Sequence, residues 1–426
     1  MRIAALCQKL RHLPLKNALL LSLLNQCITS GGNFAVGIYL ARTLSLREFG
    51  IYGICYGICM LYLGVGNAII LTQMLVNMVE VDASEQAAYA SRMLISVLVL
   101  GALTLLVVLV LALGAYVMAP AAGAYLPTIA AVAATAVLFL CKEFFIRYAY
   151  IMRIERLAVG VSTMAIVTLA TGLALERAWD IRLTVSHVLL LSAAGAALGA
   201  VVGYGFSVLQ IGRQMRAGVA DFMAAWYLGR WALGGVMVTW LQSQSYTYVL
   251  AAMLGPAGVG QANAARIFIS PFSFLLPAVN QIAMPRLAEL RHHAPHRLLR
   301  VGVLITAALL LLALLYSAVL LQTLSLVTQT VLGHTDPAVQ SLIWIWCVVV
   351  INQMILNGGS NILQVMRQFR VLTLLNLISA LTALLAACTL VQVLGAPGAI
   401  WAVAVGEILL SILIWRDIRG AHDQRS

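Results

Sequence analysis

The sequence predicts an all-α, polytopic membrane protein with twelve transmembrane helices. Hydrophobic residues make up 62% of its 426 residues, charged residues make up only 9%, and the mean hydropathy is +0.98. A soluble domain carries roughly 25% charged residues, so this chain has too few to cover a water-facing surface. Backbone polar groups in hydrocarbon must be bonded internally, and apolar runs of about 20 residues cross the bilayer as helices. Barrel strands would instead appear as short alternating segments.

Hydropathy and loop signals together give the positions of the twelve spans. They lie near residues 17–41, 50–79, 92–119, 124–146, 157–176, 183–210, 224–254, 261–285, 299–329, 338–365, 370–394 and 397–415. An even number of spans puts both termini on one side of the membrane. Of the Lys and Arg residues, 21 fall on that side and five on the other. Positive loops mark the cytoplasm, so both termini are expected to be cytoplasmic.

The basic charge and the metal-ligand residue types do not indicate any further function. The net charge of +12 is scattered among the spans, and no domain could present it as a patch to nucleic acid. Most of the seven cysteines fall inside apolar runs, as small core hydrophobes do. The cluster His292, His293 and His296 is interpreted as a solvated basic loop. We therefore predict no metal and no cofactor, and the short loops leave no room for a catalytic domain, so we predict no enzyme activity.

A weak internal repeat divides the chain into halves. The segment Leu40–Gly50 aligns without gaps on Leu250–Gly260, and both follow the first span of a six-span half. The matching pairs, at an offset of 210 residues, are Leu40/Leu250, Ala41/Ala251, Leu44/Leu254 and Gly50/Gly260. Since six spans is an even number, the halves insert the same way up. The sequence predicts two lobes, 1–215 and 216–426, related by a two-fold axis along the membrane normal.

Four segments spread over the chain carry a family resemblance. Leu40–Tyr52 looks like a first-loop pattern, Leu254–Arg266 like a central one, Pro277–Leu287 like the end of an eighth span, and Leu394–Ile400 like a last loop. In this order and spacing they resemble the polysaccharide branch of the multidrug/oligosaccharidyl-lipid/polysaccharide exporter superfamily, which includes the O-antigen (Wzx-type) flippases. Gln261 departs from the pattern, which usually has an aromatic residue there.

The resemblance implies a flippase of the bacterial inner membrane. It would move a polyprenyl-pyrophosphate-linked oligosaccharide to the outer leaflet, driven by an ion gradient, for O-antigen, capsule or exopolysaccharide synthesis. Its implied partners are this lipid-linked substrate, membrane lipid, and polysaccharide polymerase and chain-length proteins. Twelve spans fit these flippases, whereas the lipid II flippases usually have fourteen.

Two other classes remain open on the sequence. A cation-coupled multidrug exporter of the same superfamily would need an acidic cavity, but here embedded basic residues outnumber acidic ones. A membrane enzyme such as a polysaccharide polymerase would need a long external loop, whereas the longest external loops here are about ten residues.

Arg266 is the clearest candidate for substrate binding. A charge inside the bilayer costs about 2.5–3.5 kcal/mol on insertion scales, so it usually faces a cavity. Arg266 shares a helix face with Asn263, and the planar guanidinium suits a phosphate because it donates paired hydrogen bonds. The alternative is an arginine that reaches the outer interface. Pro271, Pro277 and Pro285 predict a bend in this span.

The remaining candidates are less specific. The resemblance favours basic groups in the amino-terminal lobe, here Lys142 and Arg147, although Glu143 could simply pair with Arg147 on the same helix. Glu407, a lone acid in the last span, is an ion-coupling candidate or a partner for another helix. The other substrate-binding candidates are Arg42, Gln242, Asn33 and Gln73. The tenth span also carries a polar stripe of Gln353, Asn357, Asn361 and Gln364. Such stripes can instead hold helices together.

Overall fold

The computed structural model describes residues 15–78, 81–82, 84–209 and 211–423, and this part of the chain contains helices and no strand. The helices are α2 (Leu15–Thr43), α3 (Leu46–Gly66), the π-helical turn η1 (Asn67–Leu71), α4 (Thr72–Asn77), α5 (Gln86–Met118), the 3-10 turn η2 (Pro120–Tyr125), α6 (Leu126–Ile151), α7 (Glu155–Ala178), α8 (Val185–Gly205), α9 (Ile211–Ile267), α10 (Ser270–His293), α11 (Pro295–Gln322), α12 (Leu324–Leu332), α13 (Pro337–Val365), α14 (Phe369–Leu394) and α15 (Ala396–Asp423). The all-α fold class is confirmed.

The helices fit a polytopic membrane protein. Every predicted span overlaps a helix: the second is α3, η1 and α4 together, and the ninth is α11 and α12. Among the described residues, nine helices are long and apolar enough to cross a membrane, or up to ten if the bent pair α9 and α10 forms one span. The predicted number of twelve transmembrane spans is compatible with these helices. Of the residues that enter the charge asymmetry, Arg2, Lys9, Arg11 and Arg425 lie outside the described residues.

The chain forms two compact units. The N-terminal unit comprises Met1–Val36 and Cys55–Val236, and the C-terminal unit comprises Gly37–Ile54 and Met237–Ser426. Helices α2, α3 and α9 therefore each contribute residues to both units. The two-lobe division at residue 215 and the symmetry axis between the lobes stay predictions.

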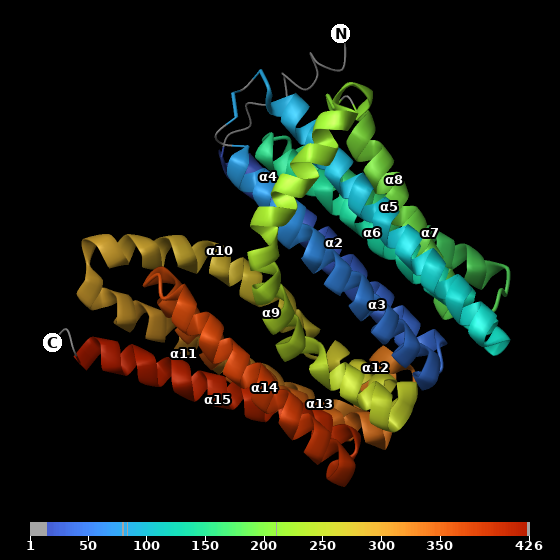
Figure 1. Cartoon of the computed structure of the whole chain (residues 1–426). Helices are drawn as coiled ribbons and strands as arrows, with labels where there is room; N and C mark the ends of the chain where they lie inside the picture. Colours follow the sequence, from blue (N-terminus) through green and yellow to red (C-terminus); the bar gives the residue numbers. More distant parts are fainter. Residues whose placement is uncertain (1–14, 79–80, 83, 210, 424–426) are drawn as a thin grey trace. The chain divides into compact units, whose positions relative to one another are not determined.

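In the N-terminal unit, α6 is the central helix. It packs against α5, α7 and α8 (Figure 1). Its residues Phe144 and Tyr148 are fully buried, their rings stack with centroids 6.4 Å apart, and both belong to a core that reaches Ile69 and Ile70 in η1. This apolar core fixes the interior of the unit.

In the C-terminal unit, α13 is central and packs against α10, α11, α14 and α15. Two breaks interrupt the helical segment formed by α9 and α10. Inside α9, Gly255 adopts φ +73° and ψ −177°, a backbone conformation that favours glycine. After Ile267, a break leads into α10, and the two helices are bent by 54°. Pro271 lies in the first turn of α10, where a missing N–H costs nothing. The predicted eighth span is therefore bent, but at a break before Pro271, whereas Pro277 and Pro285 lie inside the continuous helix α10.

The repeat glycines Gly50 and Gly260 lie against each other in the C-terminal unit. A Cβ placed on Gly50 would overlap the carbonyl oxygen of Pro256, and one on Gly260 would overlap that of Leu46. An offset of 210 residues converts Leu46 to Pro256 and Gly50 to Gly260, so the contact is reciprocal. Only glycine allows two helices to approach this closely in a membrane.

Candidate substrate-binding site

Arg266 lies in the last turn of α9, half-buried against aromatic rings of the C-terminal unit. Its Nη1 donates a hydrogen bond to the Tyr246 hydroxyl at 3.1 Å, and its Cζ lies 5.5 Å from the centre of the Trp346 ring. The two rings meet edge to face, and Trp346 Nε1 donates to the carbonyl oxygen of Ala262 at 3.2 Å. Neutral groups therefore hold the guanidinium in place.

No carboxylate of the described residues forms an ion pair with Arg266. The carboxyl of Glu407 is near enough to interact with it electrostatically. A guanidinium has five N–H donors, and the hydrogen bond to Tyr246 uses one of them. A buried cation that is not paired directly with an acid is costly, so Arg266 is suited to bind an anion that comes and goes.

A polar cavity of about 420 Å3 lies in the same unit, and we call it the carboxamide cavity. Most of its lining residues carry an amide, a hydroxyl or a carboxyl group. The lining residues are Thr239, Gln242, Ser243, Leu276, Asn280, Met284, Gln353, Leu356, Asn357, Ser360, Asn361, Gln364, Asn376 and Glu407. Glu407 is the one ionisable side chain among them, so no lining residue is a cation.

Three asparagines join α10 to α13 at this cavity. Asn280 and Asn357 exchange hydrogen bonds, Nδ2 of each donating to Oδ1 of the other at 2.9 and 3.1 Å. Asn361 Nδ2 donates to the same oxygen of Asn280 at 2.8 Å. Nearby, Gln353 Nε2 donates to Glu407 Oε1 at 2.9 Å and links α13 to α15. The polar stripe of the tenth predicted span thus faces other polar helices and the cavity at once.

The other candidates in the C-terminal unit have partners of their own. Gln242 lines the carboxamide cavity and donates to the Ser379 hydroxyl at 3.3 Å. Asn263 accepts a 3.4 Å hydrogen bond from Tyr246, which places it beside Arg266. Arg42 is exposed, and it donates to the carbonyl oxygens of Thr330 and Val331 at the end of α12. Its position there is that of a cation at a helix C-terminus.

The remaining candidates belong to the N-terminal unit. Arg147 Nε and Glu143 Oε1 form an ion pair of 3.0 Å along α6, and Lys142 Nζ lies 5.3 Å from the centre of the Phe139 ring. Asn33 is exposed on α2 and Gln73 is half-buried on α4. The structure therefore groups the candidates into two sets, one in each unit.

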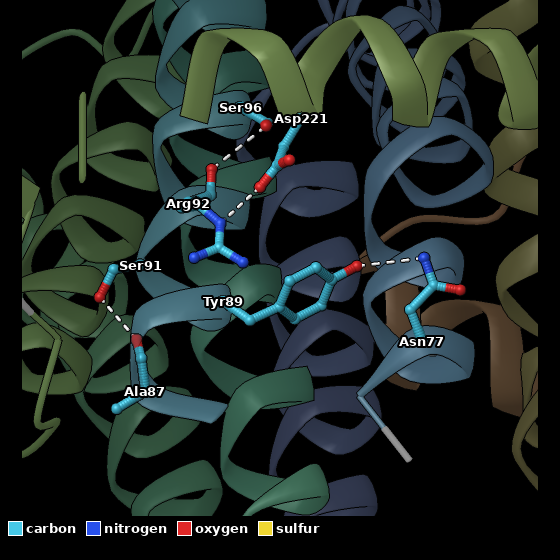
Figure 2. Close-up of polar contacts among 7 residues, drawn as sticks. All are labelled: Asn77, Ala87, Tyr89, Ser91, Arg92, Ser96 and Asp221. Atoms are coloured by element: carbon cyan, nitrogen blue, oxygen red, sulfur yellow. Dashed lines mark hydrogen bonds and ion pairs between the residues drawn. The ribbon is translucent and has the colours of Figure 1, made fainter. Parts of the chain in front are cut away.

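Figure 2 shows a polar cluster that sequence reasoning did not find. Arg92 Nε of α5 forms a 2.6 Å ion pair with Asp221 Oδ2 of α9, although 129 residues separate them. The Arg92 guanidinium lies 5.6 Å from the centre of the Tyr89 ring, and the Tyr89 hydroxyl accepts from Asn77 Nδ2 at 3.2 Å. From the sequence, Arg92 was only a positive loop residue. The ion pair therefore links the first part of α9 to α5 within the N-terminal unit.

The fold is that of known transporters. An inward-facing multidrug resistance MATE family transporter of the MOP superfamily matches with a TM-score of 0.71 and 13% identity, over 94% of this chain and 96% of that one. The lipid II flippase MurJ in an inward closed conformation matches with a TM-score of 0.69 and 10% identity, over 94% and 87%. A MOP superfamily transporter from Pyrococcus furiosus matches with a TM-score of 0.62 and 13% identity, over 97% of each chain. No protein-family model and no curated protein sequence matches the chain.

Proposed function

We propose that this protein is a flippase that moves a polyprenyl-pyrophosphate-linked oligosaccharide across the bacterial inner membrane. The observation that carries the proposal is Arg266, a guanidinium held by Tyr246 and Trp346 with no ion-paired acid among the described residues. Its remaining donors suit the pyrophosphate, because planar, charge-assisted hydrogen bonds to phosphate oxygens are strong.

The chemistry of such a substrate explains why a protein is needed. The glycan and the pyrophosphate cannot cross hydrocarbon, whereas the prenyl tail is already soluble in it. Polar groups such as Arg266 would hold the head group during alternating access, while the tail stays in lipid. Lys142 and Arg147 would be a second basic group for the phosphate, and Glu407 would couple transport to an ion gradient. Both termini would be cytoplasmic.

The alternative is a cation-coupled multidrug exporter. One observation favours it: Glu407, the ionisable lining residue of the carboxamide cavity, is an acid. A carboxylate would attract a cationic drug. Against it, the lining contains no aromatic ring and only three apolar side chains, Leu276, Met284 and Leu356, whereas drug-sized ligands are bound mostly by hydrophobic and aromatic groups.

The test is transport by Arg266 variants. Arg266→Ala should lower the export of surface polysaccharide, in a strain that lacks its own flippase, by about 10- to 100-fold, because a hydrogen-bonded charge contributes about 1.5–3 kcal/mol. Arg266→Lys should export at an intermediate level, since it keeps the positive charge and loses the planar pair of N–H donors. Arg300→Ala removes an exposed arginine of α11 and is the matched control.

Membrane levels of each variant are measured by immunoblot. Normal export by Arg266→Ala at a normal protein level would refute the proposed site. Efflux of a cationic dye that depends on Glu407 and not on Arg266 would establish the exporter instead.

A further inference from the structure

The carboxamide cavity offers far more hydrogen bonds than the protein itself uses. Seven of its lining residues are amides: Gln242, Asn280, Gln353, Asn357, Asn361, Gln364 and Asn376. Each amide has two N–H donors and an oxygen with two lone pairs. In the asparagine trio, each nitrogen donates a single bond to a neighbouring amide. Holding the helices together therefore uses about half of the donors in the trio.

Three groups at the cavity strengthen this point. Gln364 and Ser360 line the cavity, and their side chains form no hydrogen bond with another described residue. Glu407 accepts from Gln353 through Oε1, while its buried Oε2 has no hydrogen-bond partner among the residues that the structure describes. An unpaired buried polar atom destabilises the protein, so a ligand that donates a hydrogen bond to this oxygen would remove the penalty.

We propose that the carboxamide cavity is a saccharide site for a neutral sugar of the translocated glycan, a proposal that rests on the proposed flippase function. A sugar hydroxyl both donates and accepts, and an acetamido group has the same donor and acceptor as a carboxamide. Amides that present both atoms can therefore satisfy several hydroxyls of one ring. The volume of about 420 Å3 falls in the range of roughly 300–1,000 Å3 typical of small-molecule sites.

The charge of the lining selects among sugars. Burying an ionised group without a counter-charge is costly, and no Lys, Arg or His lines the cavity. A uronic acid, or a sugar that carries sulfate or phosphate, would find no cation there and would face the carboxyl of Glu407. The site therefore favours hydroxyl and acetamido sugars and rejects acidic ones.

The two binding chemistries lie in one unit but on separate residues. Arg266 does not line the cavity, although Glu407 interacts with it electrostatically. The pyrophosphate would bind at Arg266 and the neutral glycan at the amides. The cation is thus kept away from the sugars, and the sugars are recognised by neutral groups.

The experiment is saturation-transfer NMR on the full-length protein in lipid nanodiscs of phosphatidylethanolamine and phosphatidylglycerol, whose head groups contain no sugar. The probes are glucose, N-acetylglucosamine and glucuronate at pH 7 and equal ionic strength. Glucose and N-acetylglucosamine should bind, and glucuronate should bind at least about 10-fold more weakly, the factor that corresponds to roughly one unpaired buried polar group.

Two variants localise the binding. Gln364→Leu and Ser360→Ala remove side-chain groups that make no hydrogen bond within the described part of the chain. Each variant should therefore fold normally and weaken neutral-sugar binding about 2- to 10-fold, the value of one uncharged hydrogen bond. Gln322→Leu, at an exposed end of α11, is the matched control and should bind like the wild type. The melting temperature of each variant confirms folding.

Three results would overturn the saccharide site: no binding of either neutral sugar, glucuronate binding as tight as glucose, or unchanged binding in both cavity variants. The flippase proposal fails in a different way. If the wild-type protein fails to restore polysaccharide export in the flippase-deficient strain while neutral sugars still bind in nanodiscs, the flippase assignment is wrong and the sugar site remains.

Discussion

The contact between Gly50 and Gly260 can be tested by adding one methyl group. In Gly50→Ala the new Cβ would overlap the Pro256 carbonyl oxygen and lie 2.9 Å from the backbone nitrogen of Gly260. These are backbone atoms, so α3 and α9 must separate, and overpacking of this kind costs about 1–3 kcal/mol. Replacing a helical glycine by alanine otherwise gains up to about 1 kcal/mol. After subtracting a gain of about 1 kcal/mol, the net expectation is a loss of up to about 2 kcal/mol.

The matched control is Gly31→Ala in α2, where a Cβ has no neighbour within 4 Å. It should be neutral or slightly stabilising, because only the helix propensity changes. The assay is denaturant unfolding of purified protein in nanodiscs, followed by tryptophan fluorescence. The double variant of Gly50 and Gly260 should lose less than the sum of the single losses, since helices already forced apart accept the second methyl easily. If Gly50→Ala unfolds at the same denaturant concentration as Gly31→Ala, the close approach of the two helices is refuted.

Three further predictions concern other parts of the chain. Asp221→Asn should destabilise the protein by about 1 kcal/mol in the same unfolding assay, because it removes a partly buried, charge-assisted bond to Arg92; an unchanged midpoint would mean that the pair is a solvated contact. Gly255→Ala should cost about 1–3 kcal/mol, the strain of a side chain at φ +73°, and a stability equal to the wild type would contradict that backbone conformation. In a background without native cysteines, an impermeant maleimide added outside the cell should label Ala257→Cys and not Gln424→Cys, a position outside the described residues; the reverse pattern would invert the predicted topology.

The lengths of the helices were largely predictable from the sequence. A membrane helix must be apolar over a fixed thickness, so the apolar run itself reports its extent. The tenth predicted span, 338–365, became α13, Pro337–Val365. Its start was also encoded locally, because Asp336 accepts from the Ala338 N–H as an N-cap and proline follows it.

The partners of the polar residues were not predictable in the same way. Hydropathy fixes how long a helix is, but not which neighbour its polar face meets. Asn361 was recognised as a member of a polar stripe, yet its partner Asn280 is 81 residues away and no local pattern joins them. Asn376, a lone amide in an apolar span, gave no signal beyond its polarity. The weak repeat aligned Gly50 with Gly260, but an alignment says nothing about distance, and their contact is visible only in three dimensions.

The assignment of residues 37–54 to the C-terminal unit has a consequence for biosynthesis. Leu40, Leu44 and Phe49 of this segment are buried in the finished fold. The segment packs against α9 around Pro256 and Gly260, which is synthesised 210 residues later. At about 5–20 residues per second, that interval lasts roughly 10–40 s. During that time the first helices are in the membrane, but the part of α9 that packs against residues 37–54 has not yet been made. Membrane chaperones would therefore meet the nascent chain in a half-assembled state, and a ribosome that pauses before residue 250 would prolong that exposure.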